Sequence, residues 1–423
     1  MKKILLFGLL FTIVVFGACA QPASGEVLQS DKPRVTAPGA DQAGLTALVD
    51  GNSAFAFDLY QALRKAEGNL FYSPYSISQA LAMTYAGARG QTEKQMADTL
   101  HFTLPQDRLH VALNTLDLEL AKRGQGAKGK DGEGFRLRIV NAIWGHKDYK
   151  FLQQYLDLLA ENYGAGLRTL DFVRAPEPSR NTINQWVSDQ TEGRIKDLIP
   201  QGAINDLTRL VLTNAIYFNA AWQSSFPKEA TSNGDFHLLN GSKVTVPVMR
   251  QTGPYGYAEG DGYQAVELPY DGRELSMVIF LPRQGQFEPF ETSLSGEKAK
   301  GILNSIESRQ VKLAMPKFEF DSSFSLKQVL AAMGMPIPFT TDADFSGMTG
   351  DRELFIHAIL HKAFVAVDEA GTEAAAATAV IVGTTSVPES PVEVTIDRPF
   401  IFLIRDIKTG AILFVGRVVN PAG

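Results

Sequence analysis

A run of small residues near the C-terminal end of the chain constrains the fold more than any other segment. Residues 368–378 read Asp-Glu-Ala-Gly-Thr-Glu-Ala-Ala-Ala-Ala-Thr. Alternation would place Thr372, Ala374, Ala376 and Thr378 on one face of a strand, and that face is small enough to bury. Alanine has weak strand propensity, so the segment need not be held in a sheet from the start. Composition alone also fits a flexible linker, and the flanking sequence has to decide.

The segments around this run resemble the serpins, protease inhibitors that work by inserting a reactive loop into their own β-sheet. Residues 361–373 are similar to the hinge of the serpin loop, and residues 394–404 and 416–421 to the C-terminal signature of the family. Further similar stretches follow in the family's order, at residues 69–83, 212–222, 266–270, 315–318 and 344–348. Because these stretches cover nearly the whole chain, it is identified as a member of the serpin family.

The resemblance implies an α+β domain over residues 45–423, with about nine helices, three β-sheets and an exposed reactive-centre loop. Hydrophobic periodicity agrees with this class, because helical patterns dominate the first half of the chain and strand-like runs the second. Helices are predicted at residues 45–66, 76–88 and 91–100 and in a stretch ending near Arg123. Strands are predicted at residues 137–144, 210–219, 244–249, 275–281, 311–320 and 356–367.

The resemblance also implies a function, that of a serine protease inhibitor and not an enzyme. A target serine protease, or alternatively a cysteine protease, would cut the loop, form an acyl-enzyme and be carried along as the cut loop inserts. The implied hinge consists of Glu369, Gly371, Thr372, Glu373, Ala374, Ala375, Ala376, Ala377 and Thr378. Small side chains and the absence of proline before Pro388 favour rapid insertion, hence an inhibitor. A non-inhibitory serpin acting as a binding module and an unrecognised hydrolase are the alternatives.

The position of the reactive bond follows from counting along the loop. Roughly seventeen residues from Glu369, as family loops usually allow, lead to the bond between Thr385 and Ser386. Counting back from Pro399 finds about three residues more than many serpins have, so either the far side of the loop is longer or the bond lies nearer Ser386–Val387. We prefer the first count, since the length of the inserted strand constrains it.

The chemistry of the loop restricts the target in either register. Neither lysine nor arginine occurs between Lys362 and Arg398, so a trypsin-like enzyme finds no cationic side chain to bind. Residues 380–387 offer only small and β-branched side chains. This composition favours an elastase-like or subtilisin-like protease.

Two further groups of residues are implied by the resemblance alone. Buried polar side chains at Ser73, Ser76, Asn214 and His361 match the gate across which the sheet opens. Trp222 and Lys317, together with the hinge glutamate, match the point where the loop enters the sheet. Ordinary packing or a surface ion pair is the competing interpretation for each of them.

The N-terminal residues 1–20 resemble an export signal. Lys2 and Lys3 precede an apolar run over residues 4–16, which is too short for a comfortable membrane span. Cleavage before Cys19 would make the cysteine a lipidated first residue, whereas cleavage after Ala20 would be the ordinary kind. We therefore expect an exported protein, extracellular or attached to the cell envelope only through a lipid at Cys19.

Residues 21–44 are rich in alanine, proline, glycine and aspartate, and this composition predicts a flexible linker. The chain has a net charge of -6 and a pI near 5.6, which argues against a nucleic-acid partner. Its single cysteine excludes an internal disulfide. We expect a monomer.

No cofactor or metal is expected. His357 and His361 have helical metal-ligand spacing but lie in a strand-like run. The glycine-rich residues 124–131 resemble a phosphate-binding loop, yet a helix precedes them and Asp131 replaces the required hydroxyl. We interpret this stretch as a solvated surface loop. Its basic residues lie where some serpins bind polyanions, namely Lys122, Arg123, Lys128 and Lys130.

Overall fold

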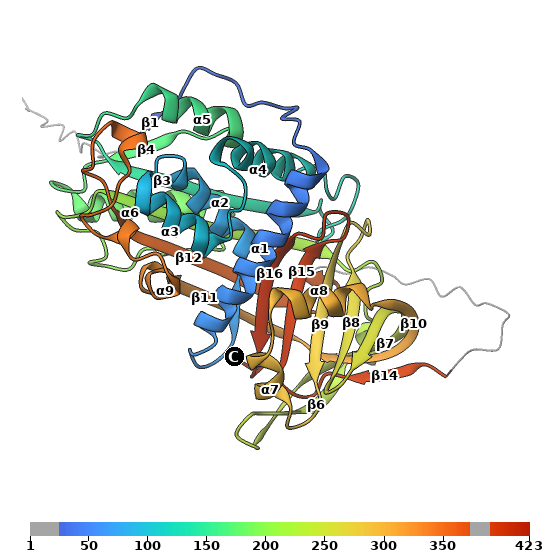
Figure 1. The fold of residues 1–423 in the computed structure, drawn as a ribbon. Coiled ribbons are helices and arrows are strands. Elements are labelled where there is room, and N and C mark those ends of the chain that lie inside the picture. The colour runs from blue at the N-terminus through green and yellow to red at the C-terminus, as the bar shows by residue number, and fades with distance from the viewer. Residues whose placement is uncertain (1–24, 373–389) are drawn as a thin grey trace, which may run out of the picture.

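A computed structural model describes residues 25–372 and 390–423 (Figure 1). The α-helices of this part are α1 (Gln42–Leu63), α2 (Pro74–Tyr85), α3 (Gly90–Leu100), α4 (Gln106–Leu120), α5 (Gln153–Tyr163), α6 (Pro176–Gln190), α7 (Phe287–Thr292), α8 (Gly296–Asn304), α9 (Lys327–Met333) and α10 (Ser346–Thr349), with short 3-10 helices at Lys228–Ala230 and Ile337–Phe339. We expected about nine helices. The extra one is α10, a single turn of 4 residues.

The strands of the described residues form two hydrogen-bonded sheets, where the resemblance implied three. The main sheet has the order β1 (Glu26–Leu28), β4 (Leu167–Leu170), β3 (Arg136–His146), β5 (Leu210–Ala221), β13 (Gly371–Thr372), β12 (Ile356–Val367), β11 (Phe318–Ser325). The second sheet has the order β14 (Val392–Thr395), β10 (Glu307–Pro316), β7 (Lys243–Gly260), β8 (Tyr263–Pro269), β9 (Leu275–Pro282), β15 (Phe400–Asp406), β16 (Ile412–Val418), β2 (Leu70–Tyr72), with β6 (Ser232–His237) paired to β7. The second sheet is continuous because the 18-residue β7 joins β6 at one end and β8 at the other.

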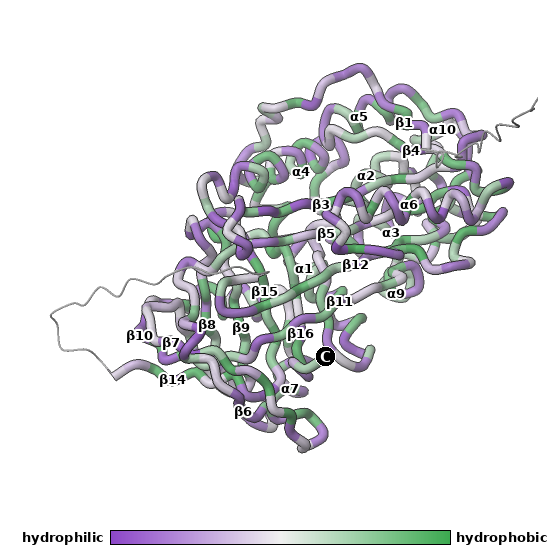
Figure 2. Tube along the Cα trace, turned by 180° about the vertical axis from the view of Figure 1, so that it is seen from behind, coloured by the Kyte–Doolittle hydropathy of each residue, from purple (hydrophilic) through white to green (hydrophobic). Residues whose placement is uncertain are grey.

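Alternation along the strands places two apolar cores on the two faces of the main sheet. On β5, Leu212 and Ile216 face the large core shared with the second sheet, whereas Val211 and Ala215 face a smaller core beneath α6. This explains why the sequence of β5 is almost continuously apolar. Figure 2 shows hydrophobic segments along the interior strands β15 and β16, both almost entirely buried.

Helix α2 lies wholly inside the molecule, since all of its residues are buried. Its start is fixed by Ser73, whose side chain accepts a hydrogen bond from the Ser76 backbone N–H, and by Pro74 in the first turn. The start of this helix therefore carries two of the predicted gate residues into the core.

Most predicted elements agree with the structure to within a few residues, with two exceptions. The strand predicted at residues 244–249 is only the start of β7, which continues to Gly260. The apolar run at residues 311–320 was expected to be one strand but forms two, β10 and β11. Pro316 ends β10, because proline cannot donate a ladder hydrogen bond, and the chain then passes to the main sheet.

The prediction of a flexible linker at residues 21–44 is wrong for its described part. Residues 26–41, which we call the arm, are bound to the domain: β1 pairs antiparallel with β4, and the Val35 N–H donates to the Glu161 carbonyl at 2.9 Å. Arg34 donates to Asp117 at 2.5 Å and to Asn114 at 2.9 Å. Backbone hydrogen bonds and ion pairs hold the arm. Neither kind of contact produces a hydrophobic pattern in the sequence, so the pattern could not reveal them.

Within the described residues, no helix has both the length and the apolar character needed to cross a membrane.

We predict that Arg34→Ala lowers the free energy of unfolding by about 1–2 kcal/mol, because the variant leaves Asn114 and Asp117 without their charged donor. Chemical denaturation of both proteins measures this. The control is Lys94→Ala, which removes a pair with Asp98 whose side chains are 64% and 65% exposed and should change stability by less than ~0.5 kcal/mol. Equal losses in the two variants would contradict a docked arm.

Candidate functional site

The root of the predicted loop lies inside the main sheet. Gly371 and Thr372 form β13, which pairs with Ala221 and Ala220 of β5 on one side and with Val367 of β12 on the other. The Thr372 side chain is buried, and its hydroxyl lies 2.8 Å from that of Tyr270. The first residue expected to insert therefore already occupies the sheet.

Gly371 permits this arrangement because of how closely the backbone approaches β5. A Cβ atom at this position would lie 2.2 Å from the Ala220 carbonyl oxygen and 2.7 Å from the Ala221 Cα. No larger residue fits without moving the strand. This close contact explains why the hinge has glycine at this position, which the sequence pattern alone did not explain.

The predicted point where the loop enters the sheet is assembled around Glu369. Lys317 and Thr231 each donate a hydrogen bond of 2.8 Å to its carboxylate. Burial raises the pKa of this carboxyl group, but the hydrogen bonds from Lys317, its backbone and Thr231 outweigh burial and lower the pKa overall. Glu369 is therefore held ionised.

Trp222 completes this point of the sheet. Its indole N–H donates to the Asp368 carbonyl at 2.9 Å, and its ring stacks on Tyr270 with centroids 4.7 Å apart. Tyr270 in turn contacts Thr372. The structure thus brings Trp222, Lys317 and the root of the hinge together.

Further down the sheet, β5 and β12 pair directly with each other, from Leu210 opposite Ile356 to Ile216 opposite Ala363. An inserting strand would have to separate this pair. Asn214 and His361 lie opposite each other in it, and the Asn214 amide oxygen accepts a hydrogen bond from His361 Nδ1.

The four predicted gate residues form one buried hydrogen-bonded group. The Ser73 backbone N–H donates to His361 Nε2 at 3.2 Å, which assigns the proton of the neutral imidazole to Nδ1. The Asn214 amide donates to the Ser76 hydroxyl. Burial lowers the pKa of His361 to about 3, so the gate histidine is neutral.

The buried group has one further member that the sequence patterns did not indicate, Asn141 on β3. Its amide oxygen accepts hydrogen bonds from Asn214 and Ser76, and its amide nitrogen donates to Gln79 at 2.9 Å. An asparagine amid the β-branched and apolar residues of the predicted strand at residues 137–144 was the available signal, because polar groups in such a run need partners.

The group continues to the arm. Gln79 donates to Asp117 at 3.2 Å, and Asp117 accepts from Arg34. An unbroken series of hydrogen bonds therefore joins the arm on the outer edge of the sheet to the Asn214–His361 pair between β5 and β12.

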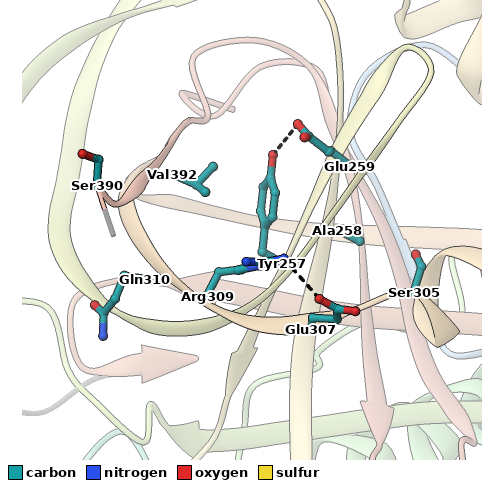
Figure 3. A pocket seen from close by; sticks show the side chains of 9 residues that line it. All are labelled: Tyr257, Ala258, Glu259, Ser305, Glu307, Arg309, Gln310, Ser390 and Val392. Carbon is teal, nitrogen blue, oxygen red and sulfur yellow. Dashed lines mark hydrogen bonds and ion pairs between the residues drawn. The ribbon is translucent and has the colours of Figure 1, made fainter. Parts of the chain in front are cut away.

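A shallow pocket of about 280 Å³ lies near the far root of the loop, where Ser390 and Val392 lead into β14 (Figure 3). The Tyr257 hydroxyl donates to Glu259 at 2.9 Å, and Arg309 pairs with Glu307 at 3.3 Å. The pocket is lined mainly by polar side chains, and no histidine contributes to its described lining.

Comparisons with known proteins agree with this geometry. The family model for Serpin (serine protease inhibitor) matches residues 50–421. An uncharacterized serpin-like protein of Thermococcus kodakarensis is 44% identical over 377 residues, which are 88% of this chain and 86% of that protein. The chain belongs to the serpin family.

Two more similarities place this serpin among its relatives. The human leukocyte elastase inhibitor is 41% identical over 387 residues, covering 88% of this chain and 99% of the inhibitor. The crystal structure of tengpin, a thermophilic serpin in the native state, matches with a TM-score of 0.80 at 26% identity and covers 93% of this chain and 97% of that one.

Several predicted positions lie outside the residues that the structure describes. They are the hinge from Glu373 to Thr378, the reactive bond Thr385–Ser386 and the lipidation site Cys19. Their roles in this serpin stay predictions.

The neutral gate histidine predicts how the stability of this serpin depends on pH. Between pH 6.5 and about 3 the unfolded chain binds a proton at His361 and the folded chain does not, so stability falls as pH falls. A proton on Nε2 would also point at the Ser73 N–H donor. His361→Gln can still accept and donate one hydrogen bond each, and it should weaken the pH dependence by about 1.4 kcal/mol per pH unit below pH 6.

Denaturation midpoints of both proteins, measured from about pH 7.5 to about pH 5, check this expectation. The variant should keep part of the slope, because burial also lowers the pKa of His110, to about 4. Parallel curves for the two proteins would show that His361 is not the titrating group.

Proposed function

We propose that this serpin inhibits serine proteases by trapping them as covalent acyl-enzymes while its cut loop inserts into the main sheet. The observation that carries the proposal is the seating of β13 between β5 and β12. Insertion then lengthens a strand that already exists, so no new strand has to be nucleated. The residues that follow in the sequence, from Glu373 to Thr378, are mostly alanine and therefore small enough to be buried.

The register of β13 supports the proposal independently of the resemblance. Thr372 lies opposite Ala220 of β5 and Val367 of β12, and both pairings are antiparallel. Six residues further along the loop, Thr378 would therefore face Asn214, because 220 minus 6 is 214, and His361, because 367 minus 6 is 361. Those two residues already face each other. The register of β13 on β5 and its register on β12 would therefore both bring Thr378 to the same pair, Asn214 and His361.

The energy of insertion favours trapping. A dozen or more new backbone hydrogen bonds at ~0.5–1.5 kcal/mol each amount to on the order of 10 kcal/mol, comparable with the whole stability of a domain. The uncut form is then kinetically trapped. From Thr372 to Thr385 the inserted strand spans about 46 Å at ~3.3 Å per residue, enough to carry the protease to the other end of the sheet.

The proposed target is an elastase-like or subtilisin-like protease. The loop presents Thr384, Thr385, Ser386 and Val387 near its predicted apex, and no cationic residue is nearby in the sequence. The name of one relative, leukocyte elastase inhibitor, points to the same class of enzyme.

Incubation with pancreatic elastase or subtilisin, followed by denaturing electrophoresis, tests the proposal. We expect a covalent complex that survives denaturation, and mass spectrometry of the released peptide should find a new amino terminus at Ser386. Loop cleavage should also raise the thermal midpoint, because the inserted strand stabilises the sheet. Cleavage without a complex, at an unchanged midpoint, would favour a non-inhibitory binding serpin, and turnover of added peptides would indicate a hydrolase.

We predict that Thr372→Arg converts the inhibitor into a substrate. The Thr372 side chain is 2% exposed against Tyr270, so a longer cation would have to be desolvated there. The number of inhibitor molecules consumed per protease inactivated should rise at least about tenfold, the factor given by ~1.4 kcal/mol in the rate of insertion. Thr103→Arg, at an exposed site between α3 and α4, is the control and should leave this number unchanged.

The proposal also includes export and a lipid anchor at Cys19, supported by Lys2, Lys3 and the apolar run that follows them. Labelling of producing cells with a palmitate analogue should mark the wild-type protein and not Cys19→Ser. An unlabelled mature protein that begins at Gln21 would establish ordinary cleavage instead.

A further inference from the structure

The segment between α4 and β3, residues 121–135, is built into the top of the main sheet. The expectation of a solvated basic loop is wrong for two of its four cations. Arg123 forms a buried ion pair with Asp406 at 2.6 Å, and the Lys130 side chain is only 3% exposed. They are therefore not presented to a polyanion. Each has an acidic partner far away in the sequence, which a local pattern cannot identify.

Lys130 joins this segment to both strands that flank the insertion path. Its backbone N–H donates to the Asn219 side-chain oxygen on β5 at 2.6 Å. Its ammonium lies 3.1 Å from the Asp368 carboxylate and 3.3 Å from the Ala366 carbonyl at the end of β12. A Cβ atom on Gly129 would lie 2.7 Å from the same Asn219 oxygen, so the glycine allows this approach.

Asp368, the partner of Lys130, shapes the turn from which the loop starts. One carboxylate oxygen accepts from the Ala370 N–H at 2.9 Å, while the other faces the Lys130 ammonium. The Asp368 N–H donates to the Gly371 carbonyl at 3.0 Å. This turn fixes which residues of β13 face β12, and hence the register of everything that would follow.

We infer that Lys130 is a positioning residue for loop insertion: through Asp368 it holds the turn between β12 and β13 in the register from which the strand grows. The inference rests on the proposed function. Because β13 is already seated, the turn need not change as the strand lengthens. The ion pair then acts on the rate of insertion and not on recognition of the protease or the first cut.

The test compares Lys130→Met, Asp368→Asn and the double variant in inhibition of pancreatic elastase and subtilisin. Each single variant should raise the number of inhibitors consumed per protease inactivated by roughly fivefold, the factor that ~1 kcal/mol represents. The double variant should be no worse than the worse single one, since both remove the same interaction. Lys130→Arg, which retains the charge, should recover most of the loss.

Three controls separate positioning from general destabilisation. Lys128→Met makes the same substitution at an exposed residue of the same segment and should have no effect. The rate of loop cleavage by excess protease should be unchanged in every variant. The thermal midpoint of the cleaved Lys130→Met protein should still lie well above that of its uncut form.

The possible failures can be told apart. If the wild type forms no covalent complex with either protease, the proposed function fails. The inference is then tested by the rate of insertion after cleavage, followed by the fluorescence of Trp222 beside the hinge. If Lys130→Met inserts and traps like the wild type, or if the two single effects simply add, the inference is overturned.

Discussion

The proposed mechanism depends on a competition for the inner edges of β5 and β12. At the top of the main sheet both strands pair with β13, whereas lower down they pair with each other. Strand for strand, a complete β13 would satisfy more backbone groups than the direct pairing of its neighbours. The other features of the site lie along these two strands. Some contacts hold β5 and β12 together, and others fix where β13 would begin to lengthen.

The polar group at the gate shows how a buried network can serve such a sheet. Each member has a partner across an element boundary: Ser73 and Ser76 at the start of α2, Asn141 on β3, Asn214 on β5 and His361 on β12. Hydrogen bonds of this kind are directional and lose their energy over a small displacement. Such bonds can therefore hold two strands together firmly and break within a small separation of the strands. An apolar contact would weaken more gradually as the strands separate.

Much of this arrangement could be predicted from the sequence, because the hinge and gate lie in stretches with a strong family resemblance. The apolar alternation at residues 356–367 gave the limits of β12. The arm and Lys130 could not be predicted. Both are held by hydrogen bonds and ion pairs to partners 80 or more residues away, such as Glu161 and Asp368, and no local period encodes such contacts. The role of Asn141 lay within reach, since a polar residue in a buried strand needs partners.

The arm and the root of the loop join the main sheet at opposite ends. β1 is attached through β4 to the Trp144–His146 end of β3, opposite Leu210 of β5, whereas β13 pairs at Ala220. These levels are about 33 Å apart along ten residues of β5 at ~3.3 Å each, and β1 and β14 lie at opposite ends of Figure 1. With an anchor at Cys19, β13 at the root of the loop would lie at the end of the sheet away from the membrane. Insertion would then turn a captured enzyme from the outward side of the molecule to the lipid side, leaving it between its inhibitor and the cell surface.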